Sequence, residues 1–353
     1  MLVNGKHYRT VWYENKKLFI IDQRNLPHEF NISKLSTLNE VVIAIKDMHI
    51  RGAGLIGAVA AFGMCFAFKE SKQNLEILKR LTTDLLNTRP TAVNLSWAIS
   101  KQMELIEQGT TFDNLINNAI AIADDDSNCC EKIGIHGIEL IEQIYKKTNQ
   151  TVNILTHCNA GWLAFVDFGT APAPIYAAKK KGIPVHVYVD ETRPRNQGAR
   201  LTAWELVHQN IDHTIITDNT GGHLMQHGLV DMVITGCDRM TLNGDAANKI
   251  GTYLKALAAK DNDVPFYVAL PHSTIDLDIE DGIKNIQIEE RDPSEVKYIQ
   301  GLVDGELKSV LLTPLKSKAL NFGFDVTPSR LITKVITEKG IFNPSDLKKA
   351  YLR

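Results

Sequence analysis

The sequence predicts an α/β protein in which a small domain of a β-hairpin and helices precedes an open, doubly wound sheet of parallel strands. Two patterns support this prediction. Helical periodicity of apolar residues covers residues 36–147. From residue 151 onward, short apolar runs alternate with helical patterns, which is typical of a parallel sheet covered by helices. We place the boundary at residues 148–151, so that the expected domains are 1–150 and 151–353.

The first domain is expected to begin with a hairpin. Residues 8–13 and 17–22 are rich in β-forming side chains and flank a polar turn at 14–16. Helices are then expected where apolar residues recur three and four positions apart, at 41–48, 75–86 and 126–145. Pro90 favours the start of a further helix just after it.

The second domain alternates strands and helices. The expected strands are residues 152–156, 184–189, 214–217, 232–235, 265–270 and 310–313. The expected helices are residues 173–180, 199–208, 221–227 and 246–259. Ligands of open parallel sheets bind beyond the carboxyl ends of the strands. Polar or glycine-rich loops follow five consecutive strands, at 157–161, 190–194, 218–219, 236–245 and 271–274, and predict a binding crevice at that edge.

Composition excludes several classes of protein. With 44% hydrophobic and 23% charged residues, the chain is not a disordered one. Its 39 Lys and Arg against 41 Asp and Glu give a net charge of −2, which argues against nucleic acid as the main partner but allows a small basic pocket for a phosphate. The five scattered cysteines fit neither a disulfide framework nor a zinc ribbon.

The N-terminal residues are polar and mixed in charge, without the apolar core of a signal peptide. No uncharged run is expected to approach the ~20 residues that a membrane span requires. We therefore expect a soluble, cytoplasmic protein without a membrane partner.

Two residues at strand exits are candidate catalysts. Cys158 precedes a turn into an expected helix, whose N-terminus would favour the thiolate; the alternative is a small buried apolar residue. Asp238 is the other candidate, and the alternative is an ion pair with Arg239 at the end of a strand.

Three basic residues are candidate ligands for an anion. Residues 243–249 are expected to enter a helix, where backbone N–H groups and Lys249 could hold an anion or simply cap the helix. Arg51 stands beside Gly52 and Ala53, which allow a ligand to approach the backbone closely, unless this segment only connects two helices. Arg89 is either a phosphate ligand or a solvated charge.

No cofactor or metal is expected. The glycines after Arg51 do not form a dinucleotide-binding fingerprint, because no strand precedes them. His157, His213 and His272 are not spaced as metal ligands, and we expect them to be structural histidines.

Six segments, ordered along almost the whole chain, carry a resemblance to a known family: RGAGLIGAVAAFG (51–63), RPTAVNLSWAI (89–99), ILTHCNAG (154–161), ETRPRNQGARLTAWEL (191–206), GCDRMTLNGDAANKIGTY (236–253) and FDVTPSRLITKVITEKGI (324–341). The chain resembles the methylthioribose-1-phosphate isomerases, aldose–ketose isomerases of methionine salvage. Relatives of that family include isomerases of other pentose 1-phosphates and regulatory subunits of a translation-initiation exchange factor.

The resemblance implies a Rossmann-like second domain, a homodimer, a sugar-phosphate substrate and no cofactor. It assigns catalysis to Cys158 and Asp238. It assigns substrate binding to Arg51, Gly52, Ala53, Arg89, Gln197, Asn248 and Lys249, all but Gln197 toward the phosphate. Alternatives are an isomerase of 5-deoxyribose 1-phosphate or another pentose 1-phosphate, and a non-catalytic sugar-phosphate-binding regulatory subunit. The presence of both Cys158 and Asp238 argues against the subunit.

The chain departs from the family pattern at Leu55, Trp162 and Phe322, which we expect to act on the 5-substituent of the substrate if they line the pocket. Two routes for the chemistry are open. Proton transfer would use Cys158 as a thiolate base at C2 and Asp238 as an acid of raised pKa. A hydride shift would instead need an apolar site that stabilises the transient charges.

Overall fold

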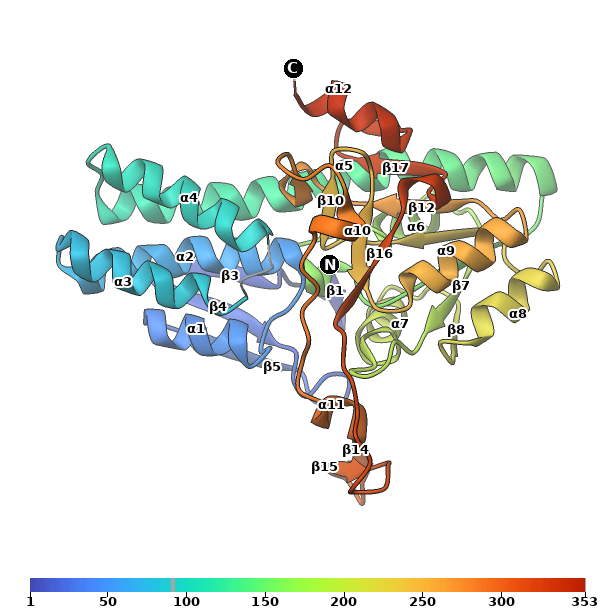
Figure 1. The fold of residues 1–353 in the computed structure, drawn as a ribbon, viewed down its shortest axis with the longest axis horizontal. Coiled ribbons are helices and arrows are strands. Elements are labelled where there is room, and N and C mark those ends of the chain that lie inside the picture. The colour runs from blue at the N-terminus through green and yellow to red at the C-terminus, as the bar shows by residue number, and fades with distance from the viewer. Residues whose placement is uncertain (90–92, 353) are drawn as a thin grey trace.

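The computed structural model describes residues 1–89 and 93–352 (Figure 1). The helix start expected at Pro90 lies outside this part of the chain. The N-terminal hairpin is confirmed, since β3 (Val11–Glu14) and β4 (Lys17–Asp22) pair antiparallel from Glu14 opposite Lys17. A third strand that was not predicted, β5 (Asn31–Leu35), pairs with β4, and the short strands β1 (Leu2–Val3) and β2 (Lys6–His7) pair with each other.

Five helices follow in the region of helical periodicity: α1 (Leu38–Lys46), α2 (Ala53–Ser71), α3 (Leu75–Leu86), α4 (Val93–Glu107) and α5 (Phe112–Thr148). The expected segment 126–145 is the second half of α5, and α2 was not among the segments singled out. The apolar helix α2 lies at the centre of this bundle and contacts the other four helices. It is long and apolar enough to cross a membrane, so our expectation that no run approaches that length was wrong. Because 83% of its apolar window is buried inside the protein, α2 forms the core of the bundle.

The C-terminal part contains a seven-stranded sheet, which confirms the predicted fold class. Its strands stand in the order β18 (Gly340–Phe342), β17 (Lys334–Thr337), β12 (Phe266–Ala269), β9 (Met232–Thr235), β6 (Val152–Thr156), β7 (Val185–Asp190) and β8 (His213–Ile216). All neighbours are parallel except β17 and β18. The chain therefore leaves β6 toward one edge and continues from β9 toward the other, as in a doubly wound sheet.

The C-terminal part also contains the helices α6 (Ala173–Lys180), α7 (Ala203–His208), α8 (Thr220–Gln226), α9 (Thr252–Asp261), α10 (Gly282–Asn285), α11 (Ser294–Lys297) and α12 (Leu347–Tyr351). A π-helical turn, η2 (Gly198–Thr202), leads into α7. The 3-10 turns are η1 (Trp162–Ala164), η3 (His272–Thr274), η4 (Ser329–Leu331) and η5 (Pro344–Asp346).

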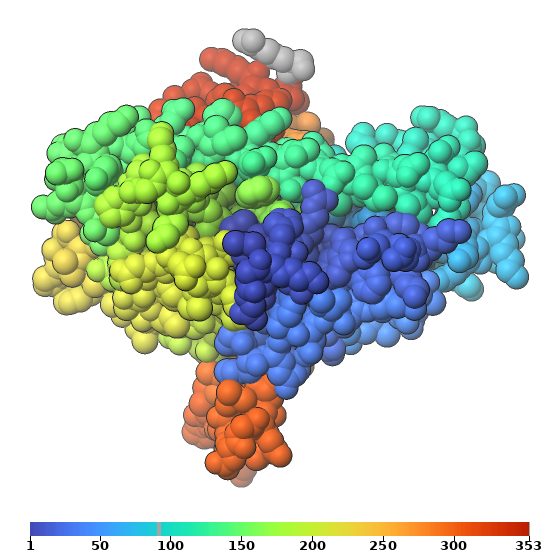
Figure 2. All heavy atoms as spheres, turned by 180° about the vertical axis from the view of Figure 1, so that it is seen from behind, coloured from blue at the N-terminus to red at the C-terminus, as the bar shows by residue number. Residues whose placement is uncertain are grey.

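The expected helix 246–259 starts later than predicted, because only its part from Thr252 onward is helical, as α9 (Thr252–Asp261), and one expected strand is wrong. Residues 246–259 begin with a strand, β11 (Ala246–Lys249), because the Asn243-Gly244 turn, with Gly244 at φ 88°, closes a hairpin with β10 (Arg239–Thr241). These two strands form a second sheet with β13 (Ile275–Asp276) and β16 (Phe324–Thr327). Residues 310–313 do not join the parallel sheet. Part of them belongs to a hairpin of β14 (Tyr298–Val303) and β15 (Glu306–Leu311), which projects from the body of the protein (Figures 1 and 2).

The sixth parallel strand is β17, which the sequence pattern did not single out. Helix α5 ends at Thr148, close to the expected domain boundary, but it contacts both α2 in the first part and α6 and β17 in the second. The division into two domains stays a prediction.

Two of the three departures from the family pattern lie in hydrophobic cores. Trp162 is fully buried beneath the large sheet, with its ring centroid 6.0 Å from that of Trp204. Leu55 is fully buried in the helical core. Phe322, in contrast, is 47% exposed. Packing rather than substrate contact therefore explains the side chains of Leu55 and Trp162.

The Trp162→Ala substitution should lower the free energy of unfolding by about 3–5 kcal/mol, because it leaves a large cavity in a closed core. Urea unfolding of the two proteins measures this difference. The matched control is Trp12→Ala, which removes a half-buried indole and should cost clearly less. A loss below about 1 kcal/mol for Trp162→Ala would contradict the packing role.

Candidate active site

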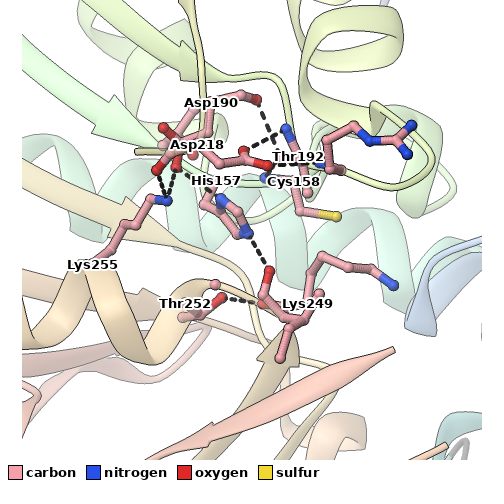
Figure 3. A network of polar contacts seen from close by, with 12 residues as sticks. His157, Cys158, Asp190, Thr192, Asp218, Lys249, Thr252 and Lys255 are labelled. Atoms are coloured by element: carbon pink, nitrogen blue, oxygen red, sulfur yellow. Dashed lines mark hydrogen bonds and ion pairs between the residues drawn. The ribbon is translucent and has the colours of Figure 1, made fainter. Parts of the chain in front are cut away.

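Two strand exits meet where the strand order of the large sheet reverses. Cys158 follows β6, and Asp238 follows the neighbouring strand β9. The charges of Arg51, Lys249 and Asp238 all act on the Cys158 thiol, so the structure brings these four predicted residues together. The Cys158 sulfur and the Lys249 ammonium extend to the same side of the close view in Figure 3.

A pocket opens beside Asp238. Most of its lining is apolar, and its polar groups are the Arg89 and Arg239 side chains, the Gln287 amide and the Asp238 carboxylate. The lining residues are Gly52, Ala53, Ile56, Arg89, Asp238, Arg239, Ala247, Ile286, Gln287, Ile288 and Phe324.

The N-terminus of α2 faces this pocket. Gly52 caps the helix with φ at 95°, and a Cβ atom there would lie 2.5 Å from Ala164, so only glycine fits. Since α2 is 19 residues long and begins at Ala53, its free N–H groups and its dipole favour an anion in the pocket. Arg51 and Gly52 therefore end the connection between α1 and α2, as one alternative expected, and they also lead into a helix whose N-terminus faces the pocket.

Arg51 holds the loop that carries Cys158. Its Nη1 and Nη2 donate to the side-chain and backbone oxygens of Asn159 at 2.5 and 2.7 Å, and its buried Nε has no partner. Arg89, half-buried at the pocket wall, donates from Nη2 to Glu289 at 3.2 Å. Burial lowers the pKa of the Arg89 guanidinium, and the Glu289 carboxylate opposes this shift.

Lys249 is on strand β11 and not at a helix start, which corrects the sequence prediction. Its Nζ lies 4.6 Å from the centre of the Phe324 ring. Burial lowers the pKa of Lys249, while the charges of Cys158 and Asp238 oppose that shift. The adjacent Asn248 is buried and donates from its amide to Thr252 Oγ1 at 3.0 Å.

Cys158 is held in a rarely used backbone conformation, with φ at 67°. Such conformations cost about 1–3 kcal/mol in a residue other than glycine and concentrate at functional sites. The backbone N–H of Cys158 donates to Thr192 Oγ1 at 2.8 Å, its carbonyl accepts from Thr202 Oγ1 at 2.7 Å, and its Sγ donates to Gln197 Oε1 at 3.3 Å. Gln197, found only through the family resemblance, thus lies against the thiol.

The expected thiolate is not favoured in this structure. Burial raises the pKa of the Cys158 thiol, and the charges of Arg51 and Lys249 offset only part of this effect. The helix expected directly after the Cys158 loop is only the three-residue turn η1, which begins four residues later. Burial also raises the pKa of Asp238, against the charges of Lys249, Arg51 and Arg89. A raised pKa is what an acid at that position requires.

Comparison with known proteins decides the family. Residues 49–344 match the model of the Initiation factor 2 subunit family. Methylthioribose-1-phosphate isomerase from Desulfatibacillum aliphaticivorans is 56% identical over 98% of this chain and 97% of its own. The chain belongs to the methylthioribose-1-phosphate isomerase family.

Other relatives agree. The methylthioribose-1-phosphate isomerase of Sulfurimonas denitrificans is 56% identical over 95% of each chain. The crystal structure of 5-methylthioribose 1-phosphate isomerase from Pyrococcus horikoshii superposes with a TM-score of 0.83 at 39% identity, over 98% of this chain and 96% of that one. The structure of translation initiation factor eIF-2B, subunit delta, from A. fulgidus has a TM-score of 0.76 at 35% identity, over 96% and 97%.

A buried polar network beneath the site of this isomerase-family chain was not predicted (Figure 3). His157 contacts Asp190 through Nδ1 and the Ile250 carbonyl through Nε2, both at 2.8 Å, so it is a satisfied structural histidine as expected. Lys255 lies 3.0 Å from the same Asp190 carboxylate and donates to the Asp218 carbonyl. The network fixes the ends of β6, β7 and β8 relative to one another.

A chain of ion pairs closes the other side of the pocket and was also missed. Arg89 pairs with Glu289, which contacts Arg291 at 2.8 Å. Arg291 contacts Glu295 at 2.8 Å, and Glu295 contacts Arg195 at 2.9 Å. Residues 286–295, which we call the strap, therefore join the pocket wall to the loop of Gln197. The strap lies outside the six segments that carry the family resemblance, and only the folded chain brings its acidic residues to these arginines.

The strap network predicts a loss of stability in acid. Burial alone would raise the pKa of Glu295, but the hydrogen bonds and charge of Arg291, with Asn321 and Arg195, lower it from 4.5 to about 2. Because the folded pKa is depressed, the stabilisation is complete above pH 4.5 and is lost as the pH falls through 2. At 1.36 kcal/mol per pKa unit, it amounts to at most about 3 kcal/mol.

Urea unfolding between pH 6 and 2 tests this in wild type and Glu295→Gln. The variant should be less stable at pH 6, and the difference between the two proteins should shrink toward pH 2. A difference that does not change with pH would show that Glu295 contributes only uncharged contacts. The exposed pair of Lys348 and Glu280 provides the control, and Glu280→Gln should have little effect.

Proposed function

We propose that this protein is an aldose–ketose isomerase that converts 5-methylthioribose 1-phosphate to 5-methylthioribulose 1-phosphate in methionine salvage. The chain is more than half identical to methylthioribose-1-phosphate isomerases along nearly its whole length. The observation that carries the proposal is that this chain has a buried thiol, Cys158, and a carboxyl of raised pKa, Asp238, beside a pocket for an anion. The pocket is mainly apolar elsewhere, which suits an uncharged 5-substituent.

The phosphate of the substrate is proposed to bind at the N-terminus of α2. The free N–H groups after Gly52 and the charges of Arg89 and Lys249 surround this end of the pocket. Arg51 orients the Cys158 loop through its hydrogen bonds to Asn159, and its guanidinium adds a positive charge close to the site. Gln197 and Asn248 remain proposed contacts to the sugar hydroxyls and the phosphate, respectively.

Asp238 is proposed as the acid that opens the ring. The phosphate blocks the anomeric oxygen of the substrate, so the ring cannot open by ordinary mutarotation. A protonated Asp238 can give its proton to the ring oxygen while the bond from C1 to that oxygen breaks. Burial raises the pKa of Asp238, which favours the protonated form that this step requires.

The site supports a hydride shift as the second step. The hydrogen moves with its electron pair from C2 to C1, and the hydroxyl proton on C2 returns to Asp238, which leaves a ketone at C2 and restores the acid. Burial supports this route in two ways: it keeps Cys158 protonated and so a poor base toward carbon, and it gives the reacting carbons an apolar surrounding. Cys158 would then hold the oxygen on C2 together with Gln197.

Purified protein should convert 5-methylthioribose 1-phosphate to the ketose faster than it converts 5-deoxyribose 1-phosphate or ribose 1-phosphate. A higher kcat/KM for another sugar would assign the enzyme to that substrate, and no turnover of any would support a non-catalytic regulatory subunit. Reaction in heavy water separates the two routes. No deuterium from solvent should enter C1 of the product by hydride shift, whereas deuterium at C1 would establish proton transfer.

The Lys249→Met substitution should raise KM by about 10–100-fold, since a hydrogen bond to a charged group contributes about 1.5–3 kcal/mol. If Lys249 contacts the phosphate group, the inhibition constant of inorganic phosphate, a competitive inhibitor, should rise by the same factor as KM. The control is Lys260→Met, which neutralises an exposed lysine at the end of α9 and should leave KM unchanged. An unchanged phosphate inhibition constant in Lys249→Met would remove this residue from the phosphate site.

Cys158→Ser and Asp238→Asn should each lower kcat by at least about 100-fold, as expected for loss of an acid–base group. The double variant should lose much less than the product of the two single losses, because residues that act in one step are not additive. Circular dichroism checks that each variant is folded. Near wild-type turnover in either folded single variant would exclude that residue from catalysis.

We also propose that the enzyme is a cytoplasmic homodimer. The family resemblance supports the dimer, and the burial of the apolar helix α2 inside the bundle supports a protein that needs no membrane. Sedimentation equilibrium measures the mass of the assembly against the 39.4 kDa of one chain.

A further inference from the structure

Four potential metal ligands converge outside the active-site pocket. Asp125 and Cys129 are one turn apart on α5, so they share a face of that helix. His272 begins the turn η3, just after strand β12, and Glu338 follows strand β17. None of the four lines the pocket beside Asp238. The cluster lies where α5 passes the end of the sheet, on the side of α12 in Figure 1.

The separations within the cluster suit metal ligands. One ligand atom from each of Asp125, Cys129 and His272 lies within 4.8 Å of the others. His272 Nδ1 lies 3.7 Å from Cys129 Sγ and 3.7 Å from Glu338 Oε1, and the other ring nitrogen, Nε2, lies 3.8 Å from Asp125 Oδ2. The two carboxylate separations are too long for hydrogen bonds. The separations of Cys129 Sγ and Glu338 Oε1 from His272 Nδ1 match the about 3.3–3.8 Å that separates two ligands of a tetrahedral zinc ion with bonds of 2.0–2.3 Å.

We propose that Asp125, Cys129 and His272 bind a zinc ion, with Glu338 as the fourth ligand. The spacing of the histidines in the sequence predicted no metal ligand, because these residues come from three separate segments. The combination of a thiol, an imidazole and carboxylates favours Zn²⁺ over Mg²⁺ or Ca²⁺, which prefer oxygen ligands alone.

In the described part of the chain, His272 is the basic partner of both carboxylates of the cluster, and the charge of Lys132 acts against the raised pKa of the Cys129 thiol. Within residues 1–89 and 93–352, no lysine or arginine forms an ion pair with Asp125 or Glu338. The second group of possible ligands in this part of the chain, at His157, Asp190 and Asp218, differs in this respect, because the Lys255 ammonium already contacts Asp190. Burial and the neighbouring carboxylates raise the pKa of the Cys129 thiol, and a dication would reverse that effect by binding the thiolate.

The surroundings orient the ligands and leave a way in. The His272 backbone N–H and the Tyr351 hydroxyl each donate to Glu338, at 3.1 Å. The edge of the His272 ring meets Trp97, with centroids 6.0 Å apart. Cys129 is buried, whereas the Asp125 side chain is 54% exposed and that of His272 34%, so an ion can enter from solvent. Such outer contacts are characteristic of metal ligands, whose orientation they fix.

A bound ion would join α5 to the ends of β12 and β17. It would add no group to the reaction, since the cluster is separate from Asp238 and Cys158. Its expected effect is on stability, because an ion that binds only the folded protein raises the unfolding temperature.

The test uses the full, tag-free protein after treatment with a chelator. Titration with Co²⁺ should give one equivalent bound per chain, with the near-ultraviolet absorption of a cobalt–thiolate bond and the visible bands of a tetrahedral site. Zn²⁺ should displace the cobalt and raise the unfolding temperature. Cys129→Ala should abolish the thiolate absorption. Asp125→Asn and His272→Gln should each weaken cobalt binding by more than about 10–100-fold, which is the typical loss when a residue that only hydrogen-bonds to a metal ligand is replaced.

The control is His136→Ala, which removes a histidine of α5 outside the cluster and should bind like wild type. Asp125→Asn changes an exposed side chain, so it keeps the test valid if the buried Cys129→Ala does not fold. A thiolate absorption that persists in Cys129→Ala would place the ion on another cysteine and overturn the proposal. So would the absence of stoichiometric binding to the wild type, or unaltered affinity in folded Asp125→Asn.

Discussion

The reversal of strand order between β6 and β9 is the constraint on which the site depends. Crossover connections between parallel strands are right-handed, so the chain leaving β6 covers one face of the sheet and the chain leaving β9 covers the other. The two loops therefore separate at this point and leave a crevice at the carboxyl end of the sheet. Cys158 and Asp238 stand on its two sides because they follow these two strands. Every other group of the site is brought to this crevice from another segment.

Burial then determines the electrostatics. Taken out of water, the Cys158 thiol and the Asp238 carboxyl both retain their protons more strongly, while Lys249 retains its proton less strongly. Burying an ionised group costs desolvation free energy, and the opposite charges close to each of these groups offset that cost. The free crevice contains Arg89, Arg239, Asp238 and the positive end of α2, and the two arginines also pair with Glu289 and Asp276. A phosphate at the N-terminus of α2, as proposed above, would bring its negative charge close to these cations.

The sequence alone predicted the parts of this arrangement that depend on local pattern. Strand β6 and helix α6 are where the alternation placed them, and the loop positions of Cys158 and Asp238 followed from the strand ends. Predictions were wrong where local preference and pairing disagree. Ala246 to Lys249 has the composition of a helix, but two neighbouring strands provide backbone partners that make it a strand. The Glu289 and Glu295 contacts join residues about 100–200 positions apart, and no periodicity records such pairs.

Helix α5 has a mechanical consequence for how substrate reaches the crevice. Its 37 residues run without interruption for about 55 Å, packed on α2 and α4 at one end and on α6 and β17 at the other. A motion that separates the two halves of the protein would have to bend α5 or break its contacts with one half. Either change would disrupt extensive packing. The pocket wall at the strap, in contrast, is held by ion pairs between side chains. We expect α5 to hold the two halves of the chain in a fixed arrangement, so that access to the crevice depends on smaller, local changes.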